Sequence, residues 1–288
     1  MKWISFAMIA LPCVMMFGQS RPPLHVIAFG AHPDDCDLKA GGVAAKFAMA
    51  GHKVKFVSVT NGDMGHHEQS GGILASRRRA EAMEAGRRIG IEYEVLDNHD
   101  GELVPSLEVR RQIIQRIREW KADLVFAPRP NDYHPDHRYT GVLVQDAAFM
   151  VTVPNLETHT AALRKNPVFL SYSDGFQRPQ PFRADVVIAI DDVIEKKISM
   201  LDAHVSQFYE WLPWHSGELD KVPQGADKRK QWLLAQRSDA VLPEWKKTLE
   251  KWYGPKAATV QFAEAFEITE YGRQPDADEI RRLFPFLP

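Results

Sequence analysis

Short apolar runs alternate with segments of helical periodicity along the first half of the chain. The predicted strands span residues 25–29, 53–60, 92–96 and 123–127, and the predicted helices span residues 38–50, 76–89 and 107–120. Gly51 and Gly90 end the first two helices, and Ser106 is a suitable N-cap for the third. This alternation predicts βαβ units in an α/β fold, with a mostly parallel sheet that helices flank on both faces.

The alternation weakens after Gly141. Three further elements are predicted there, namely a strand over 186–190, a helix over 193–204 and a strand or helix over 260–268. The segment 208–260 is rich in Trp, Lys and Pro and has no clean strand–helix rhythm. We place a boundary near residue 206. Residues 21–206 form the α/β domain, and residues 207–288 form a C-terminal extension that we expect to pack on the same sheet.

The first twenty residues have the pattern of a secretory signal. Lys2 is their only charge, and a 15-residue, mostly apolar run from Trp3 to Phe17 follows it. Gly18 and Ser20 supply the small residues that a cleavage site needs. The run is shorter than the roughly 20 residues of a membrane span. We expect residues 1–20 to be cleaved and the protein to be secreted or periplasmic without a membrane anchor. A buried N-terminal element and an uncleaved anchor are the alternatives.

Composition narrows the class of protein. The chain has 44 % apolar and 26 % charged residues, as a folded globular protein does, and its net charge of −2 gives no reason to expect a nucleic acid partner. Removal of the signal would leave Cys36 as the one cysteine, so no intramolecular disulfide could form. The stability of the exported chain must then come from its apolar core.

Unusual polar residues follow each of the four predicted strands in the N-terminal half. These turns cover residues 30–37, 60–63, 97–100 and 129–137. In an open parallel sheet, ligands bind beyond the carboxyl ends of the strands, which meet at one edge. The spacing therefore predicts a single functional site built from these four turns.

Two of the turns carry histidine and aspartate together, as HPDD at 32–35 and HPDH at 134–137. Crowded carboxylates repel one another unless a cation lies among them. His32, Asp35 and His137 supply two nitrogens and one oxygen, and three protein ligands with an open position are typical of catalytic zinc. Fe²⁺ or Mn²⁺ suits the same ligands. The alternative for the first motif is a helix N-cap with an ordinary turn histidine.

At these residues the chain resembles the LmbE-like (PIG-L) family of zinc-dependent N-deacetylases. The matching features are AHPDD at 31–35, Gly41-Gly42, Thr60-Asn61-Gly62, Arg79 with Glu81, Gly90, HPDH at 134–137 and the segment His204–Gln207. The resemblance covers roughly residues 24–207. It implies a Rossmann-like sheet and hydrolysis of an acetamide on an amino sugar.

The resemblance also implies roles, and the three ligands named above match its metal ligands. Asp34 matches the general base that takes a proton from the metal-bound water. His134 matches the imidazole that stabilises the oxyanion or protonates the leaving amine, and Asp136 matches the group that orients it. The family usually has a glutamate where this chain has Cys36. We expect a packed, non-ligating thiol there.

Residues for substrate contact are less constrained by the pattern. The candidates are Arg78, Arg79, Asp97, Asp100 and Tyr133, with Trp211 and Trp214 as further aromatic groups for a sugar ring. The adjacent His66 and His67 lie on a Gly-rich loop, where solvated side chains are the ordinary interpretation.

We therefore predict a metal-dependent hydrolase that removes the N-acetyl group from an amino sugar or glycoconjugate, with a small-molecule or oligosaccharide substrate. Two alternatives remain at this point. One is an amidase for a different acyl amide, and the other is an exported, non-catalytic carbohydrate-binding protein on the same fold.

Overall fold

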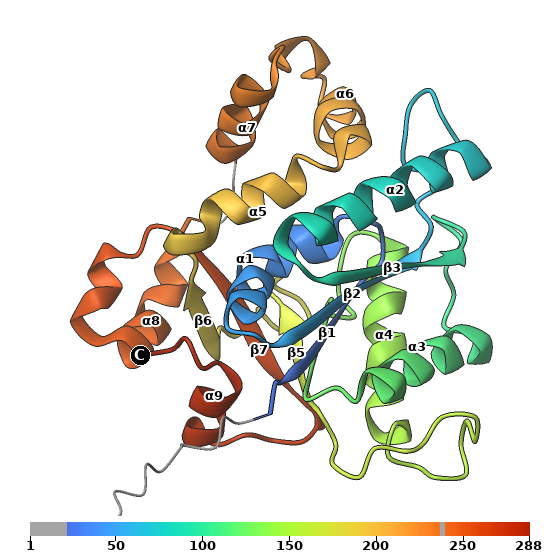
Figure 1. Cartoon of the computed structure of the whole chain (residues 1–288), viewed down its shortest axis with the longest axis vertical. Helices are drawn as coiled ribbons and strands as arrows, with labels where there is room; N and C mark the ends of the chain where they lie inside the picture. Colours follow the sequence, from blue (N-terminus) through green and yellow to red (C-terminus); the bar gives the residue numbers. More distant parts are fainter. Residues whose placement is uncertain (1–21, 237–239) are drawn as a thin grey trace, which may run out of the picture.

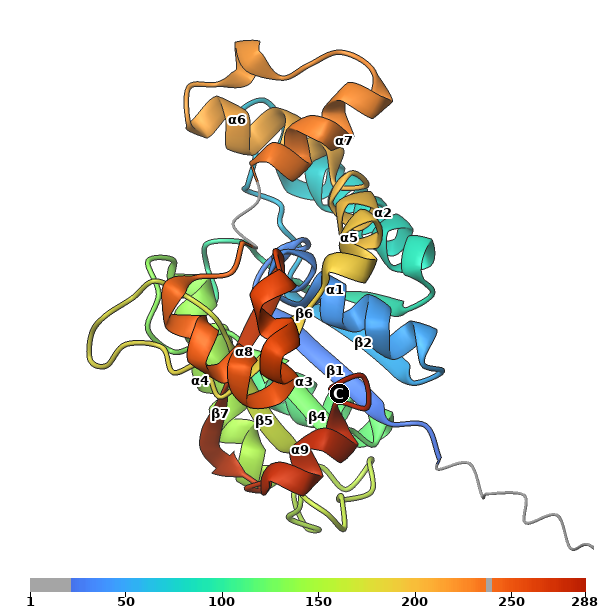
Figure 2. The ribbon, with the colours of Figure 1, turned by 90° about the vertical axis from the view of Figure 1, so that its left-hand side faces the viewer.

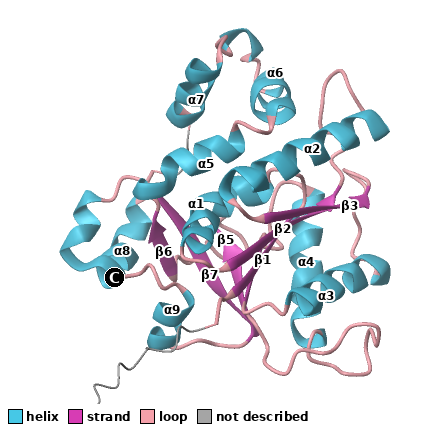
Figure 3. Cartoon of the chain, viewed as in Figure 1, coloured by secondary structure: helices cyan, strands magenta, loops and turns pink. Residues whose placement is uncertain are grey.

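The computed structural model describes residues 22–236 and 240–288, and the expected signal at residues 1–20 lies outside them. A seven-stranded sheet in the order β3-β2-β1-β4-β5-β7-β6 forms the centre of the described part (Figures 1 and 3). Its strands are β1 His25–Gly30, β2 Lys53–Thr60, β3 Glu92–Asn98, β4 Leu124–Ala127, β5 Val168–Tyr172, β6 Val186–Ala189 and β7 Ala263–Gly272. The principal helices are α1 Asp35–Met49, α2 Gly71–Ile89, α3 Leu107–Trp120, α4 Pro135–Met150, α5 Ile194–Leu201, α6 Leu212–His215, α7 Ala226–Ala235, α8 Lys246–Tyr253 and α9 Ala277–Leu283.

The sheet is mostly parallel, which confirms the predicted fold class. Strands β3, β2, β1, β4 and β5 run in one direction. Strand β7 runs antiparallel to both of its neighbours, β5 and β6. The carboxyl ends of β1 to β4 therefore meet at one edge of the sheet, and the four polar turns follow them there.

Both faces of the sheet are covered, as β1 illustrates. Val26 and Ala28 pack into a core that α1 and α9 share, whereas Ile27 and Phe29 pack against α3 and α4. Successive side chains of a strand point to opposite faces, so a strand between two helical layers must be apolar throughout. This explains the continuous apolar run that marked the strand in the sequence.

Two elements between residues 135 and 172 are absent from the sequence prediction. Helix α4 begins inside the HPDH motif, where His134 is the N-cap and Pro135 is the first helical residue. This helix packs against the sheet, and its two faces differ little in hydrophobicity. The sequence therefore shows no clear helical period there. Strand β5 is short and entirely buried between β4 and β7, after a long irregular segment. The predicted Ser106 cap of α3 is present, because its hydroxyl accepts a hydrogen bond from Val109 N.

The C-terminal residues contribute both to the sheet and to a separate helical layer. Strand β7 lies between β5 and β6, inside the sheet. Figure 2 shows α6 and α7 beyond α2 and α5, at the end of the molecule away from α9. Within the described ranges, no helix combines the length and the apolar character that crossing a bilayer requires.

A buried ion pair ties β7 to α1 and α5. Glu264 of β7 accepts hydrogen bonds from the backbone N–H groups of Gly42 (2.9 Å) and Val43 (2.7 Å) in α1. The same carboxylate lies 2.7 Å from Nζ of Lys197, whose side chain is fully buried in α5. Lys197 also donates to Leu38 O at 2.8 Å. These bonds offset the desolvation of both charges.

Removal of this carboxylate should destabilise the fold strongly. Glu264→Ala leaves the Lys197 ammonium buried without its carboxylate, so the free energy of unfolding should fall by about 3–5 kcal/mol. Denaturant unfolding followed by circular dichroism measures the change. Asp192→Ala is the control, because Asp192 is exposed and forms an ion pair with Lys46 of α1, the helix that Glu264 also contacts. This variant should lower the free energy of unfolding by less than about 1 kcal/mol. Equal losses in the two variants would contradict this account.

Candidate active site

The four polar turns meet at the carboxyl edge of the sheet. Residues of three of them line one pocket of about 730 Å³, together with Met64 and Gly65, which directly follow the turn at 60–63. Backbone and side-chain bonds join the turns directly. The N–H and the hydroxyl of Thr60 both donate to Ala31 O at 2.8 Å, and Gly101 N donates to a carboxylate oxygen of Asp136 at 2.7 Å. Residues that line the pocket include His32, Asp34, Asp35, Arg78, Asp100, Tyr133, His134, His137, Gln207, Trp211 and His215.

The structure brings the three predicted ligands together. His32 Nδ1 lies 3.2 Å from His137 Nε2 and 3.6 Å from a carboxylate oxygen of Asp35. His137 Nε2 lies 3.5 Å from the other oxygen of Asp35. Ligand atoms at 2.0–2.1 Å from a tetrahedral zinc ion are roughly 3.3–3.4 Å from one another. The spacing and the chemistry of this donor set therefore fit a divalent cation.

Two other groups within the described residues have the spacing of a metal site, and both share His32. One is His32 with His134 and His137, and the other is His32 with Asp100 and Asp136. The second group surrounds the far nitrogen of the ring, because His32 Nε2 lies 3.0 Å from Asp100 and 3.3 Å from Asp136. Ligating histidines usually donate that nitrogen to a carboxylate. Asp100 and Asp136 fit this supporting role, which would leave Nδ1 of His32 for a cation.

Asp132 gives the second histidine the same support. Its Oδ1 lies 2.9 Å from His137 Nδ1 and accepts a hydrogen bond from the backbone N–H of His134. The sequence predicts no role for Asp132, and it marks Asp100 only as a candidate for substrate contact. Both residues lie in the four polar turns, which is the one signal that the sequence offers. The partner of Asp100 lies in another turn, and the partner of Asp132 lies beyond the start of a helix, so the sequence does not show either pairing.

The pKa values of these groups reflect the crowding. Burial disfavours the charged form of His32, yet its hydrogen bonds to Asp100, Asp136 and Asp35 raise its pKa well above the usual range. Burial also disfavours the charged form of Asp35, yet the adjacent charges of His137 and His32 hold its pKa far below the usual range. The Asp35 carboxylate therefore stays ionised and attracts positive charge into the gap between the predicted ligands.

Asp34 is buried beside the ligands and is not a helix cap. It occupies the N-cap position of α1, but its side chain makes no capping hydrogen bond. Its Oδ1 lies 3.1 Å from Nη2 of Arg78. Burial raises the pKa of Asp34, and the charge of Arg78 offsets only part of this. A carboxylate with a raised pKa next to a ligand position suits a general base.

Arg78 positions Asp34 from beneath the pocket. Its guanidinium is almost fully buried and donates to Gly62 O at 3.2 Å. A Cβ on Gly62 would lie 2.5 Å from Nη1 of Arg78, and Gly62 has a φ of +72°, so only glycine fits there. A Cβ on Gly65 would also approach Arg78, at 2.8 Å. The glycine in the Thr60-Asn61-Gly62 motif thus makes room for the arginine.

His134 and Asp136 are linked differently from the expectation. The ring of His134 stands edge-on to that of His32, and its Nδ1 accepts a hydrogen bond from the backbone N–H of Asp136. The Asp136 carboxylate instead contacts His32 and the backbone N–H groups of Gly101 and Leu103. Burial and the neighbouring histidine charges lower the pKa of His134, which favours its neutral form.

The remaining candidates divide into pocket residues and surface residues. Tyr133 is exposed and lines the pocket. Arg79 and Asp97 lie 3.6 Å apart on the surface and are not among the residues that line it. Cys36 is fully buried, its Sγ donates to Ala28 O, and burial raises the pKa of this thiol.

The expectation of solvated side chains at His66 and His67 is wrong. Their side chains are only 2 % and 11 % exposed. His66 Nε2 lies 2.9 Å from Glu210, and the ring of His67 stacks on Trp214. The loop that carries them packs against a segment more than a hundred residues away in sequence. The residues near His66 and His67 in the sequence therefore give no sign that these side chains are buried.

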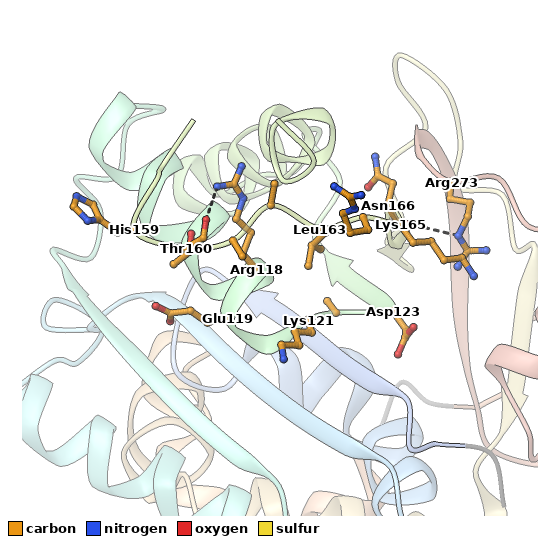
Figure 4. Close-up of a pocket in the computed structure, with 14 residues that line it drawn as sticks. Arg118, Glu119, Lys121, Asp123, His159, Thr160, Leu163, Lys165, Asn166 and Arg273 are labelled. Carbon is orange, nitrogen blue, oxygen red and sulfur yellow. Dashed lines mark hydrogen bonds between the residues drawn. The ribbon is translucent and has the colours of Figure 1, made fainter. Parts of the chain in front are cut away.

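A second hollow, of about 530 Å³, lies at the opposite edge of the sheet, near the starts of β4 and β5 (Figure 4). Basic side chains such as Lys121 and Lys165 surround it. Arg118 donates to backbone carbonyls of the adjoining loop, among them Val153 O at 2.7 Å and Thr160 O at 3.2 Å. Ligands of open α/β sheets bind at the carboxyl edge. We therefore assign the functional site to the first pocket.

Comparisons with known proteins find similarity in the part of the chain that carries the four turns. Residues 27–148 match the family model described as PIG-L: GlcNAc-PI de-N-acetylase. The chain is 32 % identical over 197 residues to a diacetylchitobiose deacetylase from Thermococcus kodakarensis, covering 66 % of this chain and 73 % of that protein. It is 27 % identical over 187 residues to a mycothiol S-conjugate amidase from Streptomyces coelicolor, covering 54 % of this chain and 63 % of that one.

Solved structures give a similar result. The N,N'-diacetylchitobiose deacetylase from Pyrococcus horikoshii superimposes with a TM-score of 0.62 and 27 % sequence identity, and the match covers 88 % of each chain.

Metal content should distinguish the ligand sets. Asp35→Ala and His137→Ala should lose most of the bound metal, because each removes one of the three predicted ligands. Asp132→Asn should weaken metal affinity by roughly 10–100-fold, because it removes the carboxylate behind His137. Elemental analysis of the purified protein and a competition titration with a chelator measure both effects.

His134→Ala is the matched control, since it removes an imidazole from the same cluster. It should retain the metal if Asp35 is a ligand. The opposite result, with metal retained in Asp35→Ala and lost in His134→Ala, would favour the three-histidine set instead.

Proposed function

This chain belongs to the PIG-L (LmbE-like) family of de-N-acetylases, and we propose that it removes the N-acetyl group from an amino sugar or a short N-acetylated oligosaccharide. The observation that carries the proposal is the convergence of His32, Asp35 and His137 beside the buried carboxylate of Asp34. An amide needs both activation of its carbonyl and a base for the attacking water. The pocket supplies residues for both tasks.

The three converging residues would hold a divalent cation. We propose Zn²⁺, although Fe²⁺ and Mn²⁺ suit the same two imidazoles and one carboxylate. When bound, such a cation lowers the pKa of water and polarises the substrate carbonyl. The carboxylates behind the rings, Asp100 and Asp136 for His32 and Asp132 for His137, keep both imidazoles oriented.

Asp34 accepts the proton of the attacking water in this proposal. Its carboxylate is buried and lies next in sequence to the ligand Asp35. The ion pair with Arg78 fixes its orientation and keeps part of its negative charge in place despite burial. General base catalysis of this kind contributes roughly 10²–10⁴-fold to rate.

His134 is placed to stabilise the negative charge that develops on the carbonyl oxygen. Its Nδ1 accepts a hydrogen bond from Asp136 N, so the neutral ring carries its proton on Nε2. That N–H is available to donate to an oxyanion, and later to the leaving amine. The depressed pKa of His134 favours the neutral ring in the resting site.

Acetate release tests the proposal. The purified protein should release acetate from N,N'-diacetylchitobiose, a chelator should abolish the activity, and added zinc should restore it. Asp34→Asn should lower kcat by roughly 10²–10⁴-fold with its metal content unchanged, because the variant lacks the base and not a ligand.

Asp146→Asn is the control for a lost carboxylate, since Asp146 lies on the outer surface of α4 and pairs with Arg110. It should keep the wild-type kcat. Release of longer acids in place of acetate would identify the alternative amidase. Sugar binding without any turnover would identify the non-catalytic carbohydrate-binding protein. Loss of metal in Asp34→Asn would overturn the assignment of Asp34 as base.

We also propose that the protein is exported and acts on an extracytoplasmic glycan. The support is the charged start, the apolar run and the small residues that end at Ser20. The mature protein should begin at Arg21, as intact-mass analysis would show. Leu11→Arg interrupts the apolar run and should keep the full-length chain inside the cell. A mature protein that begins at Met1 would contradict the proposal.

A further inference from the structure

Five aromatic rings from two distant segments form a column that we call the aromatic wall. The rings of His66 and His67 stack at 4.6 Å between centroids, and His67 stacks on Trp214 at 4.9 Å with an angle of 9° between the planes. Trp214 stacks on Trp211 at 5.4 Å, and Trp211 contacts His215 at 5.4 Å. The wall therefore joins the loop after β2 to the segment that ends in α6.

The two segments are fixed to each other without any ligand. Glu210 accepts two hydrogen bonds of 2.7 Å from the guanidinium of Arg77 in α2, and its carboxylate also lies 2.9 Å from His66 Nε2. The turn Ser206–Trp211 is π-helical, a form that is frequent at functional sites because it changes which side chains face inward. The wall is thus held in place before binding, so that binding costs less conformational entropy.

Two of the five rings of the wall border the pocket of the proposed catalytic centre. Trp211 and His215 line the same pocket as His32 and Asp34. At about 730 Å³, this pocket lies well within the range of roughly 300–1,000 Å³ that sites for drug-sized ligands occupy. The acetamide to be hydrolysed must lie against the His–Asp cluster, so the remainder of a larger substrate has to extend toward the mouth of the pocket.

Large apolar side chains that line the pocket, or stack on its lining, remain exposed. Met64 is 61 % exposed and Trp214 is 47 % exposed, and Leu212 and Tyr133 are exposed as well. Met64, Leu212 and Tyr133 line the pocket, and Trp214 stacks on the lining residue Trp211. Exposed apolar groups gathered at one place, with polar groups beside them, mark an interaction site.

A pyranose ring matches such a surface, because it presents apolar C–H groups on its faces and hydroxyls around its edge. Indole rings are amphipathic in the same way and carry much of the binding energy at sites where they occur. Building on the function proposed above, we propose that the aromatic wall binds a second sugar residue of an N-acetylated oligosaccharide. Trp211 is then the residue that makes the enzyme prefer a disaccharide to a monosaccharide.

Steady-state kinetics on two substrates test this role. KM and kcat are measured for N-acetylglucosamine and for N,N'-diacetylchitobiose with the wild type, Trp211→Ala and Trp211→Phe. Trp211→Ala should raise KM for the disaccharide roughly tenfold and change kcat less than about twofold. KM for the monosaccharide should stay within about twofold. Trp211→Phe keeps an aromatic ring and should recover part of the disaccharide preference.

Trp232→Ala is the matched control. Trp232 belongs to α7 in the same helical layer, where its ring lies 6.1 Å from that of Tyr209, but it does not line the catalytic pocket. This variant reports any general loosening of the layer. It should preserve the ratio of the two KM values even if the melting temperature falls.

Binding without turnover separates this inference from the proposed activity. In an Asp34→Asn background, calorimetric titration with N,N'-diacetylchitobiose should show roughly tenfold weaker binding when Trp211 is replaced by alanine. A wild type that releases acetate from neither sugar would refute the proposed deacetylation, while this titration would still test the wall. An unchanged KM and affinity for the disaccharide, or equal losses on both sugars, would overturn the role of Trp211.

Discussion

The concentration of buried carboxylates at one edge of the sheet is the constraint on which the site depends. Asp35, Asp100 and Asp136 surround the imidazole of His32, and none of them reaches bulk water freely. Negative charges so close together require positive charge between them. A divalent cation supplies it in the proposed enzyme. The same requirement explains the buried guanidinium of Arg78 beside Asp34.

Close packing of the backbone makes this arrangement attainable. Gly62 leaves the space that the Arg78 side chain fills, and Thr60 fastens the end of β2 to the turn that carries His32. On the other side of α1, Glu264 and Lys197 hold the helix against β7 and α5. The first helix is therefore anchored at its middle, while its start presents Asp34 and Asp35 to the pocket.

The segment after residue 206 supplies the part of the aromatic wall that borders the catalytic pocket, and in our proposal this part selects the substrate. Glu210 bonds to Arg77 of α2 and contacts His66 in the loop after β2, so these contacts join the α6 part of the aromatic wall to the main fold. The segment His204–Gln207, noticed in the sequence without a role, holds this connection in place. Ser206 bonds to Glu81 of α2, and Gln207 donates to Gly65 O beside Arg78.

The sequence by itself determined the parallel α/β sheet, the edge at which the site lies and the convergence of His32, Asp35 and His137. These follow from local periodicity and from turns that directly succeed predicted strands. Only the tertiary structure decided the partners of those ligands at Asp100, Asp132 and Asp136, the burial of His66 and His67, and the insertion of β7 between β5 and β6. The reason is physical. Strand and turn preferences act over a few neighbouring residues. Most of these contacts join segments far apart in the sequence, and the contact between Asp132 and His137 spans the start of a helix. Neither kind of contact leaves a periodic pattern in the sequence.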